Sequence, residues 1–349
     1  MSQILPDSVL WNVVIFLIAG GVIAVAGTKL AGYADRLADR TGLGEAFVGA
    51  LLLGAMTSLP GITTSFVAGW NGHASLAISN AIGGMAAQTV FLAIADICYR
   101  KANLEHAAAS VPNIINGALL IALLGGILMA SNAPEFAISG LGLAVHPVTP
   151  ALFVAYIMGL KLSQSTFEDP AWRPVKTAQT VEDSPERDPD DTEKIAVLWT
   201  KFLAVGALTA LCGWAVARTG ITLSEKTGLS ETVVGALFTA VATSTPELIT
   251  AIAAVRQGAL TLAVSNIIGG NAFDVLFAGA ADVAYRDGSI YHAIADQERF
   301  LIALTVVMTA VLILGLMRRE KSGVGNIGFE GALLIGLYAG GFLIVSFFF

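Results

Sequence analysis

A segment of the first half of the chain returns in the second half without a gap. Residues 41–96 and 227–282 align at a constant offset of 186 residues, and about 25 of the 56 aligned positions are identical. Each copy contains two long apolar stretches that are interrupted by proline, glycine and a few polar residues. Interrupted apolar helices at matching places in two halves point to a membrane transporter whose binding site lies between the repeats.

The composition excludes a soluble globular fold. Hydrophobic residues make up 55% of the 349 residues, charged residues make up 13%, and the mean hydropathy is +0.75. Most of the apolar stretches are long enough to cross the hydrocarbon core of a bilayer. The weakest of them, 147–162, is short and needs the apolar 136–146 stretch to reach that length. We predict ten spans: 9–31, 45–70, 73–97, 112–131, 147–162, 196–218, 232–255, 259–284, 299–317 and 327–349.

Five spans in each half mean that the second repeat enters the membrane from the opposite side, so the repeats are predicted to be inverted. Lysine and arginine gather on one alternating side, which the positive-inside rule makes cytoplasmic. Four cations, at 218, 226, 286 and 299, are exceptions. We therefore expect an all-α multi-pass protein of the bacterial plasma membrane with both termini outside. The cations on the cytoplasmic side are Lys29, Arg36, Arg40, Arg100, Lys101, Lys161, Arg173, Lys176, Arg318, Arg319 and Lys321.

A segment rich in proline and acidic residues separates the two apolar halves. It covers residues 163–195 and is predicted to be a solvated cytoplasmic linker between a first repeat at 1–162 and a second at 196–349. It lacks the spacing of a calcium-binding loop, so the sequence favours a plain connector over a cation sensor. The two cysteines are isolated and predict neither a disulfide nor a metal site.

Two carboxylates lie at membrane depth, where an aspartate costs on the order of 3 kcal/mol on insertion scales. Glu247 follows Pro246 in the 232–255 span, and Asp274 lies midway along the 259–284 span. Because proline removes a backbone donor, it frees the carbonyl of Ala242 as an oxygen ligand. Thr243 and Ser244 precede Glu247 by four and three residues and so share its helix face. Hard cations such as Na⁺ and Ca²⁺ bind oxygen sets of this kind.

Amide side chains accompany these carboxylates. Asn266, Gly270 and Asp274 recur at four-residue spacing, and Asn271 comes one turn before Asp274. The structural alternative is that the glycines and asparagines only pack and hydrogen-bond neighbouring helices. In the first half the same scaffold lacks the charges, because Gly61 stands at the position of Glu247 and Gln88 at that of Asp274. We expect a polar, neutral wall made of Thr57, Ser58, Asn80 and Gln88.

Other ionisable groups are expected to have structural roles. Glu45 and Glu231 open two matching helices, where a carboxylate favours the helix N-terminus. Asp96 and Asp282 end two matching helices and are interpreted as interfacial anchors or partners for neighbouring helices, with ion binding as the alternative. His73 lies in a tight turn beside Gly72 and is interpreted as a loop residue, with proton sensing as the alternative.

At these residues the chain resembles the cation/calcium exchanger superfamily over nearly its full length. The resemblance rests on Thr-Ser-Thr-Pro-Glu at 243–247 and Gly-Gly-Asn-Ala-Phe-Asp at 269–274. It implies the ten-helix exchanger fold, with Glu247 as a principal cation ligand, Asp274 as a sodium- or proton-linked carboxylate, and oxygen ligands from Thr57, Ser58, Thr243 and Ser244. The chain departs from the family at Gly61, which replaces a glutamate, at Gly84 and Gly270, which replace serines, and at Gln88, which replaces Asn or Asp.

These observations favour a secondary cation antiporter with alternating access around Glu247 and Asp274. Two carboxylates neutralise one Ca²⁺, two Na⁺ or two protons, so sodium/calcium exchange and a sodium/proton or proton-coupled cation exchange both remain open. A non-transporting scaffold or sensor, a passive channel and a membrane enzyme are the rivals; no zinc motif such as HExxH supports the enzyme. We expect inorganic cations and the lipid bilayer as partners, no nucleic acid and no cofactor.

Overall fold

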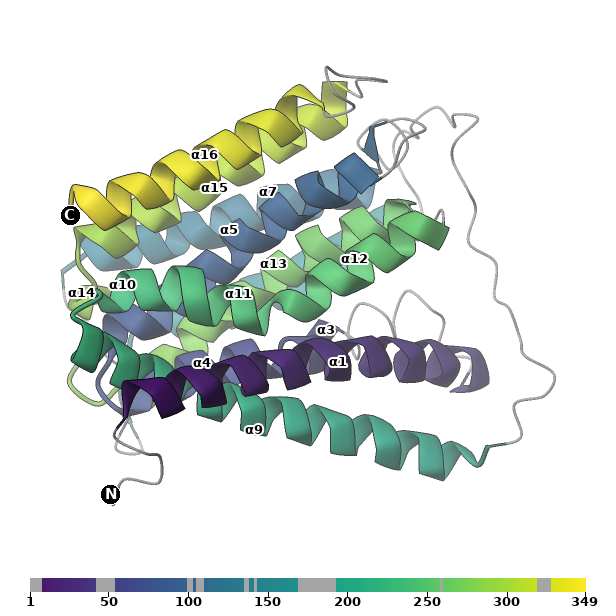
Figure 1. Ribbon diagram of the computed structural model, residues 1–349. Helices are drawn as coiled ribbons and strands as arrows, with labels where there is room; N and C mark the ends of the chain where they lie inside the picture. Colours follow the sequence, from purple (N-terminus) through teal and green to yellow (C-terminus); the bar gives the residue numbers. More distant parts are fainter. Residues whose placement is uncertain are drawn as a thin grey trace.

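The computed structural model describes residues 8–41, 54–98, 103–104, 110–134, 138–140, 143–168, 193–257, 260–318 and 328–349. Within these residues the protein is a bundle of long helices that run roughly parallel or antiparallel to one another (Figure 1). All ten predicted spans overlap helices of this bundle. For the second predicted span, residues 45–53 lie outside the described residues, and Glu45 is among them.

The first half contributes six helices and a small hairpin to the bundle. α3 and α4 are separated only by Ser58, and they are the two pieces of one interrupted helix. The elements are α1 (Val9–Thr41), α3 (Gly54–Thr57), α4 (Leu59–Trp70), α5 (Ala74–Cys98), α7 (Val111–Asn132), β1 (Ile138–Gly140), β2 (Leu143–Val145) and α8 (Val148–Glu168).

The second half has a similar order of long helices. A π-helical turn, η2 (Val234–Thr239), lies between the first two α-helical pieces of its interrupted helix, and the corresponding positions of the first half, 48–53, lie outside the described residues. The helices are α9 (Ile195–Thr227), α10 (Glu231–Val233), α11 (Ala240–Thr243), α12 (Thr245–Gln257), α13 (Leu260–Ala284), α14 (Ile290–Ala293), α15 (Asp296–Arg318) and α16 (Phe329–Phe347).

Seven of the described helices are long and apolar enough to cross a membrane on their own, and the bent pair 231–243 with 245–256 makes an eighth span. α4 is too short in its described part, and α8 carries Lys161 and Gln164 in its last turns. α8 continues through Glu168, so the first six residues of the predicted linker are helical, and 169–192 lie outside the described residues. The chain is a multi-pass integral membrane protein.

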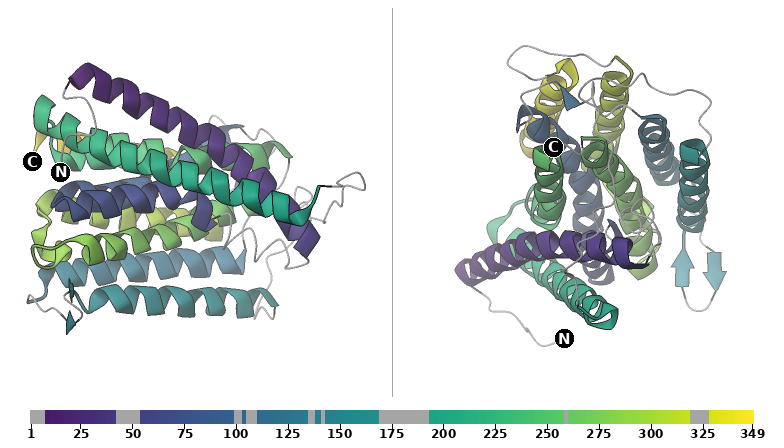
Figure 2. Two further views of the ribbon diagram at one scale, coloured as in Figure 1. Left: turned by 90° about the horizontal axis from the view of Figure 1, so that it is seen from below. Right: turned by 90° about the vertical axis from the view of Figure 1, so that its right-hand side faces the viewer.

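The stretch before α8 differs from its predicted role. We expected residues 136–146 to lengthen the fifth span, but 138–145 contain a two-stranded antiparallel hairpin in which Ile138 pairs with Val145. The hairpin projects from the end of α8 (Figure 2). Gly140 and Gly142 disfavour a continuous helix here, and α8 reaches its length at its other end instead. Apart from this short hairpin, the secondary structure of the described residues is helical.

Contacts at one end of the bundle confirm that the repeats are inverted. The His73 imidazole, in the turn after α4, lies 2.7 Å from the Glu231 carboxylate at the start of α10. The same carboxylate accepts the N–H of Leu76 at the start of α5. The interrupted helix of the second repeat therefore begins at the end of the bundle where its counterpart in the first repeat finishes.

The interior of the bundle is formed by α5 and α13, the helices that carry Gln88 and Asp274. α5 is almost fully enclosed, with 94% of its span buried. In contrast, α1 and α9 lie against each other on one side of the bundle and cross at an angle (Figure 2). Only 22% of the α1 span and 28% of the α9 span are buried, which leaves their outer faces to the lipid.

α1 and α9 each pack a glycine against a proline of an interrupted helix, and the two glycines are equivalent positions of the repeats. A Cβ atom on Gly27 of α1 would lie 2.3 Å from Cβ of Pro246, and a Cβ on Gly213 of α9 would lie 2.4 Å from the carbonyl oxygen of Pro60. Gly27 and Gly213 differ by the repeat offset, so each long helix packs on the interrupted helix of the other repeat. The absence of a side chain at both positions permits this approach.

Gly213→Ala should destabilise the protein, because the new methyl group meets the Pro60 backbone. We expect a loss of about 1–3 kcal/mol in the free energy of unfolding, as for other overpacked sites. Gly21→Ala is the matched control, since Gly21 is exposed and has no atom within 4 Å of the corresponding Cβ position. Unfolding of the purified protein in detergent measures both, and equal stabilities of the two variants would contradict the close contact.

Candidate ion-binding site between the repeats

Both interrupted helices break at a serine followed by a short proline-containing turn. Ser58 separates α3 from α4 with φ −80° and ψ −8°. Ser244 separates α11 from α12 with φ −95° and ψ 5°, and the two parts of that span meet at 45°. Pro60 and Pro246 are each the second residue of the helix that follows, a position where the missing N–H costs no helical hydrogen bond. The breaks expose backbone and hydroxyl groups inside the bundle.

Asp274 receives hydrogen bonds from the first repeat. The Ser58 hydroxyl donates to Asp274 Oδ1 over 2.8 Å, and the Gln88 amide donates to Asp274 Oδ2 over 2.6 Å. The Gln88 amide also donates to the Ser244 hydroxyl over 3.2 Å. Gln88 and Asp274 are equivalent positions of the two repeats, so their hydrogen bond crosses the pseudo-two-fold axis that relates the repeats. The Ser58–Asp274 and Ser244–Gln88 contacts are related by the same axis.

Glu247 is the second carboxylate at this centre. Its side chain is only 5% exposed, and its Oε2 atom is buried without a hydrogen-bond partner. Thr57, from the opposite repeat, is a hydrogen-bonding neighbour of this carboxylate, and the charge of Asp274 acts on it. The two acidic side chains therefore share one buried region, together with Thr57, Ser58 and Gln88.

The threonines at the two breaks are held alike. Thr57 Oγ1 donates to the carbonyl of Gly54, and Thr243 Oγ1 donates to the carbonyl of Ala240, both over 3.2 Å. These two pairs also differ by the repeat offset. Both hydroxyls thus lie at the breaks of the interrupted helices, and that of Thr57 is also a hydrogen-bonding neighbour of the Glu247 carboxylate.

The three predicted asparagines have different surroundings. Asn80 is buried among hydrogen bonds, accepting from Thr239 over 2.7 Å and donating to the Gly61 carbonyl over 3.1 Å, so it braces the broken helix. Asn266 is half-buried and donates to Thr250 over 3.2 Å. Asn271 donates to the Met85 carbonyl, its own equivalent in the other repeat, over 3.3 Å.

Three buried oxygen atoms near the axis have no hydrogen-bond partner: Glu247 Oε2, Gln88 Oε1 and Asn271 Oδ1. Carboxylate and amide oxygens are the ligands that hard cations prefer. No group of three or more His, Cys, Asp or Glu side chains able to hold a metal occurs among the residues with described positions. The centre offers two carboxylates together with neutral oxygens.

Phe277 is a site residue that the sequence analysis missed. Its ring fills the space beside Gly61, where a Cβ atom would lie 2.5 Å from Phe277 Cε2. Phe277 is buried and contacts Phe273 edge-on, with ring centroids 6.3 Å apart. Gly61 is the position where the family has its first-repeat glutamate, so an aromatic ring takes the place of that side chain. The sequence carries no signal for this exchange, because the two residues are 216 positions apart and on different repeats.

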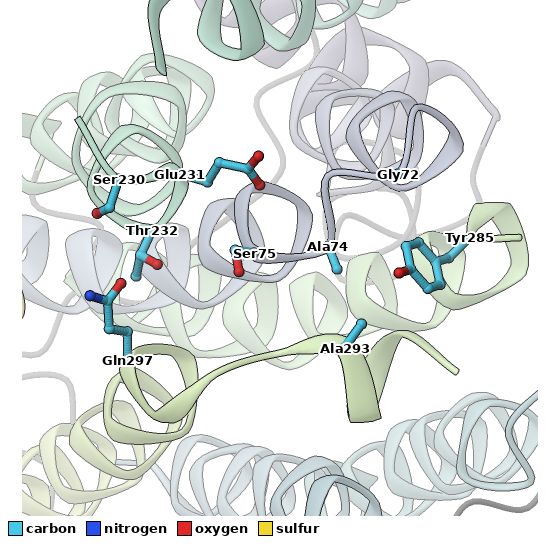
Figure 3. A pocket seen from close by; sticks show the side chains of 9 residues that line it. All are labelled: Gly72, Ala74, Ser75, Ser230, Glu231, Thr232, Tyr285, Ala293 and Gln297. Carbon is cyan, nitrogen blue, oxygen red and sulfur yellow. The ribbon is translucent and has the colours of Figure 1, made fainter. Parts of the chain in front are cut away.

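A polar cavity lies away from this centre, at the end of the bundle where α4 finishes and α10 begins (Figure 3). Its volume is about 360 Å³, and the side chains of Glu231, Ser75 and Tyr285 line it. His73, which we interpreted as a plain loop residue, is paired with Glu231 beside this cavity. Glu231 is the first residue of α10, as predicted.

The arrangement of two inverted repeats, each with a broken helix facing a buried carboxylate-containing centre, defines a secondary transporter of ions. The family model described as "Sodium/calcium exchanger protein" matches residues 11–158 and 197–348. The chain belongs to this family of cation exchangers, and it is a transport protein rather than an enzyme. The predicted fold class, two inverted five-helix repeats, is confirmed.

Relatives and solved structures agree with this assignment. The putative antiporter CaxA of Alkalimonas amylolytica is 25% identical over 329 residues, which are 93% of this chain and 96% of the relative. The sodium/calcium exchanger MaX1 of Methanosarcina acetivorans is 31% identical over 129 residues, which are 37% and 34% of the two chains.

Two solved structures share the fold. The H⁺/Ca²⁺ exchanger CAX has a TM-score of 0.69 at 16% identity, with 96% of this chain and 84% of that chain covered. The sodium-calcium exchanger NCX_Mj has a TM-score of 0.59 at 19% identity, with 96% and 99% covered.

Gly61→Glu alone should destabilise the protein by about 1–3 kcal/mol, because the new side chain collides with the Phe277 ring. In the double variant Gly61→Glu/Phe277→Ala this penalty should be smaller, since the ring is gone. Thermal unfolding of both single variants and the double variant forms a double-mutant cycle. Additive effects would contradict the contact. Calcium affinity of the double variant should exceed that of Phe277→Ala, because a third carboxylate joins the site.

Proposed function

We propose that the protein is a cation/proton antiporter in which Glu247 and Asp274 bind a cation and protons in turn. The observation that carries this proposal is the buried pair of carboxylates at the junction of the repeats, with Glu247 Oε2 lacking a hydrogen-bond partner. Two ionised carboxylates with no bound positive charge are costly to enclose, because buried ions lose their hydration. The empty site therefore does not change its access from one side of the membrane to the other. One positive ligand must replace another, which makes the transport an exchange.

The oxygen count favours protons as one of the two ligands. Two carboxylates neutralise one divalent cation, two monovalent cations or two protons. Ca²⁺ takes six to eight oxygen ligands, as a rule, and the Phe277 ring stands where the family's further carboxylate would supply up to two of them. Protonation requires only the carboxylates themselves. The Gln88 NH₂ group donates to Asp274 Oδ2 and so already occupies one carboxylate oxygen that a cation would bind.

Sodium/calcium exchange is the second candidate. It is supported by the retained hydroxyls of Thr57, Ser58, Thr243 and Ser244, which occur at equivalent places in both repeats. In this reading water and backbone carbonyls complete the calcium shell. In both readings we place Glu247 and Asp274 as the charged ligands, with Gln88, Asn271, Asn80 and Asn266 as the amide framework around them.

The membrane orientation is part of the same proposal. We place both termini outside a bacterial plasma membrane and the 163–195 linker in the cytoplasm, on the distribution of lysine and arginine. The repeats then open alternately to the two sides around the centre that they share.

Glu247→Gln should abolish cation-dependent flux, because the neutral amide cannot balance a bound cation. The measurement uses proteoliposomes under an imposed sodium gradient and follows internal calcium and internal pH in parallel. Glu225→Gln is the matched control, since Glu225 is an exposed carboxylate at the end of α9. Wild-type flux in the Glu247→Gln protein would remove Glu247 from the site.

The two ion readouts separate the candidate functions. Proton movement coupled to sodium or calcium supports the cation/proton antiporter. Calcium movement coupled to sodium, with no pH change, supports sodium/calcium exchange instead. If neither internal calcium nor internal pH changes with a correctly folded protein, the result supports a non-transporting scaffold. Flux that does not couple two ion gradients supports a passive channel.

A further inference from the structure

A second pair of repeat-related carboxylates, Asp96 and Asp282, lies at the ends of α5 and α13. Each accepts a backbone N–H from eight residues further along: Leu104 donates to Asp96 Oδ1 over 2.7 Å, and Ile290 donates to Asp282 Oδ1 over 3.1 Å. Both aspartates are fully buried. They thus perform the same structural task at the two ends of the inverted fold.

The second oxygen of Asp282 has ordinary neutral partners. Asp282 Oδ2 accepts the N–H of His146 over 2.9 Å and the hydroxyl of Thr149 over 2.7 Å. Thr149 is the second residue of α8, the last helix of the first repeat. Every oxygen of Asp282 is therefore hydrogen-bonded, and its role is structural.

The corresponding position beside Asp96 carries a second acid. Glu330 is the second residue of α16, the last helix of the second repeat, and so takes the place that Thr149 has in α8. The backbone of Gly328 hydrogen-bonds Asp96, and the charge of Glu330 acts on Asp96. The Glu330 carboxylate folds over Gly328, where a Cβ atom would lie 1.7 Å from Oε1. The two carboxylates thus converge on Gly328.

These acids are enclosed and have unused oxygens. Asp96 and Glu330 are 0% exposed, and Asp96 Oδ2, Glu330 Oε1 and Glu330 Oε2 have no hydrogen-bond partner. Asn103, next to the Leu104 that donates to Asp96, is also fully buried, and neither polar atom of its side chain has a partner. Among the residues whose positions are described, no basic side chain forms an ion pair with either acid.

A capping role does not account for Glu330. An acidic residue in the first turn favours the helix N-terminus, but both Glu330 oxygens lack a hydrogen-bond partner and so bond to none of the backbone N–H groups there. Two buried carboxylates close to one another repel. Either a bound cation or protonation of the acids relieves that repulsion. A bound cation also gives each of the three unpartnered oxygens a partner.

We propose that Asp96 and Glu330 form a second cation site, which binds a divalent cation of the calcium class. Two carboxylates balance its charge, and their three unpartnered oxygens supply hard ligands. Asp96 follows Gln88 by eight residues on α5, which is about 12 Å along the helix axis. The site is therefore separate from the Glu247–Asp274 centre and belongs to the junction of α5 with α16.

The test measures thermal unfolding of the full-length protein in detergent, with and without calcium. Glu247→Gln is included in the background so that the central site does not contribute. Calcium should raise the melting temperature of this background protein, and adding Glu330→Thr should remove the increase. Threonine is the matched substitution because it restores the residue that Asp282 already has beside it. In chelator, the Glu330→Thr protein should also melt higher than its background, since the repulsion is gone.

Two results would overturn the proposal. The first is a calcium-induced shift that is unchanged by Glu330→Thr. The second is that calcium leaves the melting temperature of the background protein unchanged while a lower pH raises it, which identifies protonation of the acids. If Glu330→Thr impairs folding, Glu330→Gln serves in its place, because it keeps the shape and removes the charge. The central site is tested separately by the flux assay: wild-type flux in the Glu247→Gln protein contradicts the central site and leaves the calcium-dependent melting temperature, which tests the second site, unaffected.

Discussion

The hydrogen bond between Gln88 and Asp274 joins the two repeats at their axis, and the central site depends on it. These residues occupy the same place in the two copies, so their contact at 2.6 Å is a meeting of equivalent positions. α5 and α13 must approach closely for it to form. Ser58 and Ser244 then extend the contact symmetrically to the two breaks in the helices. The rest of the bundle holds these four segments at that distance.

The chemistry at this centre has lost the symmetry that the backbone keeps. One half supplies Glu247 and Asp274, whereas the other supplies Gly61 and Gln88 at the equivalent positions. Phe277 fills the volume next to Gly61, so no open space lies there. A similar difference occurs further out, where the Thr149 hydroxyl donates to Asp282, whereas the second acid Glu330 acts on Asp96 with its charge. In both places the repeats share a scaffold while their charges differ.

Much of the architecture could be predicted from the sequence. The repeat at an offset of 186 residues and the lengths of the apolar stretches led to ten spans and an inverted arrangement, because lipid leaves the backbone no partners except its own. The hairpin at 138–145 was not predicted, since its apolar residues read equally well as part of a span. The position of Glu247 and Asp274 near each other follows from the repeat, but their neighbours do not. Phe277 and His73 were placed only by contacts between segments far apart in the chain.

The sequence by itself determined the membrane environment, the duplication, an interruption near proline in one helix of each repeat, and the presence of two acids at membrane depth. These are local properties, set by the polarity of side chains and by the missing N–H of proline. Only the tertiary structure decided which groups share a space: Gln88 with Asp274, Phe277 with Gly61, and Glu330 with Asp96. Helix packing determines these three pairs. An enclosed helix is apolar on every face, so its sequence does not show which face meets which neighbour.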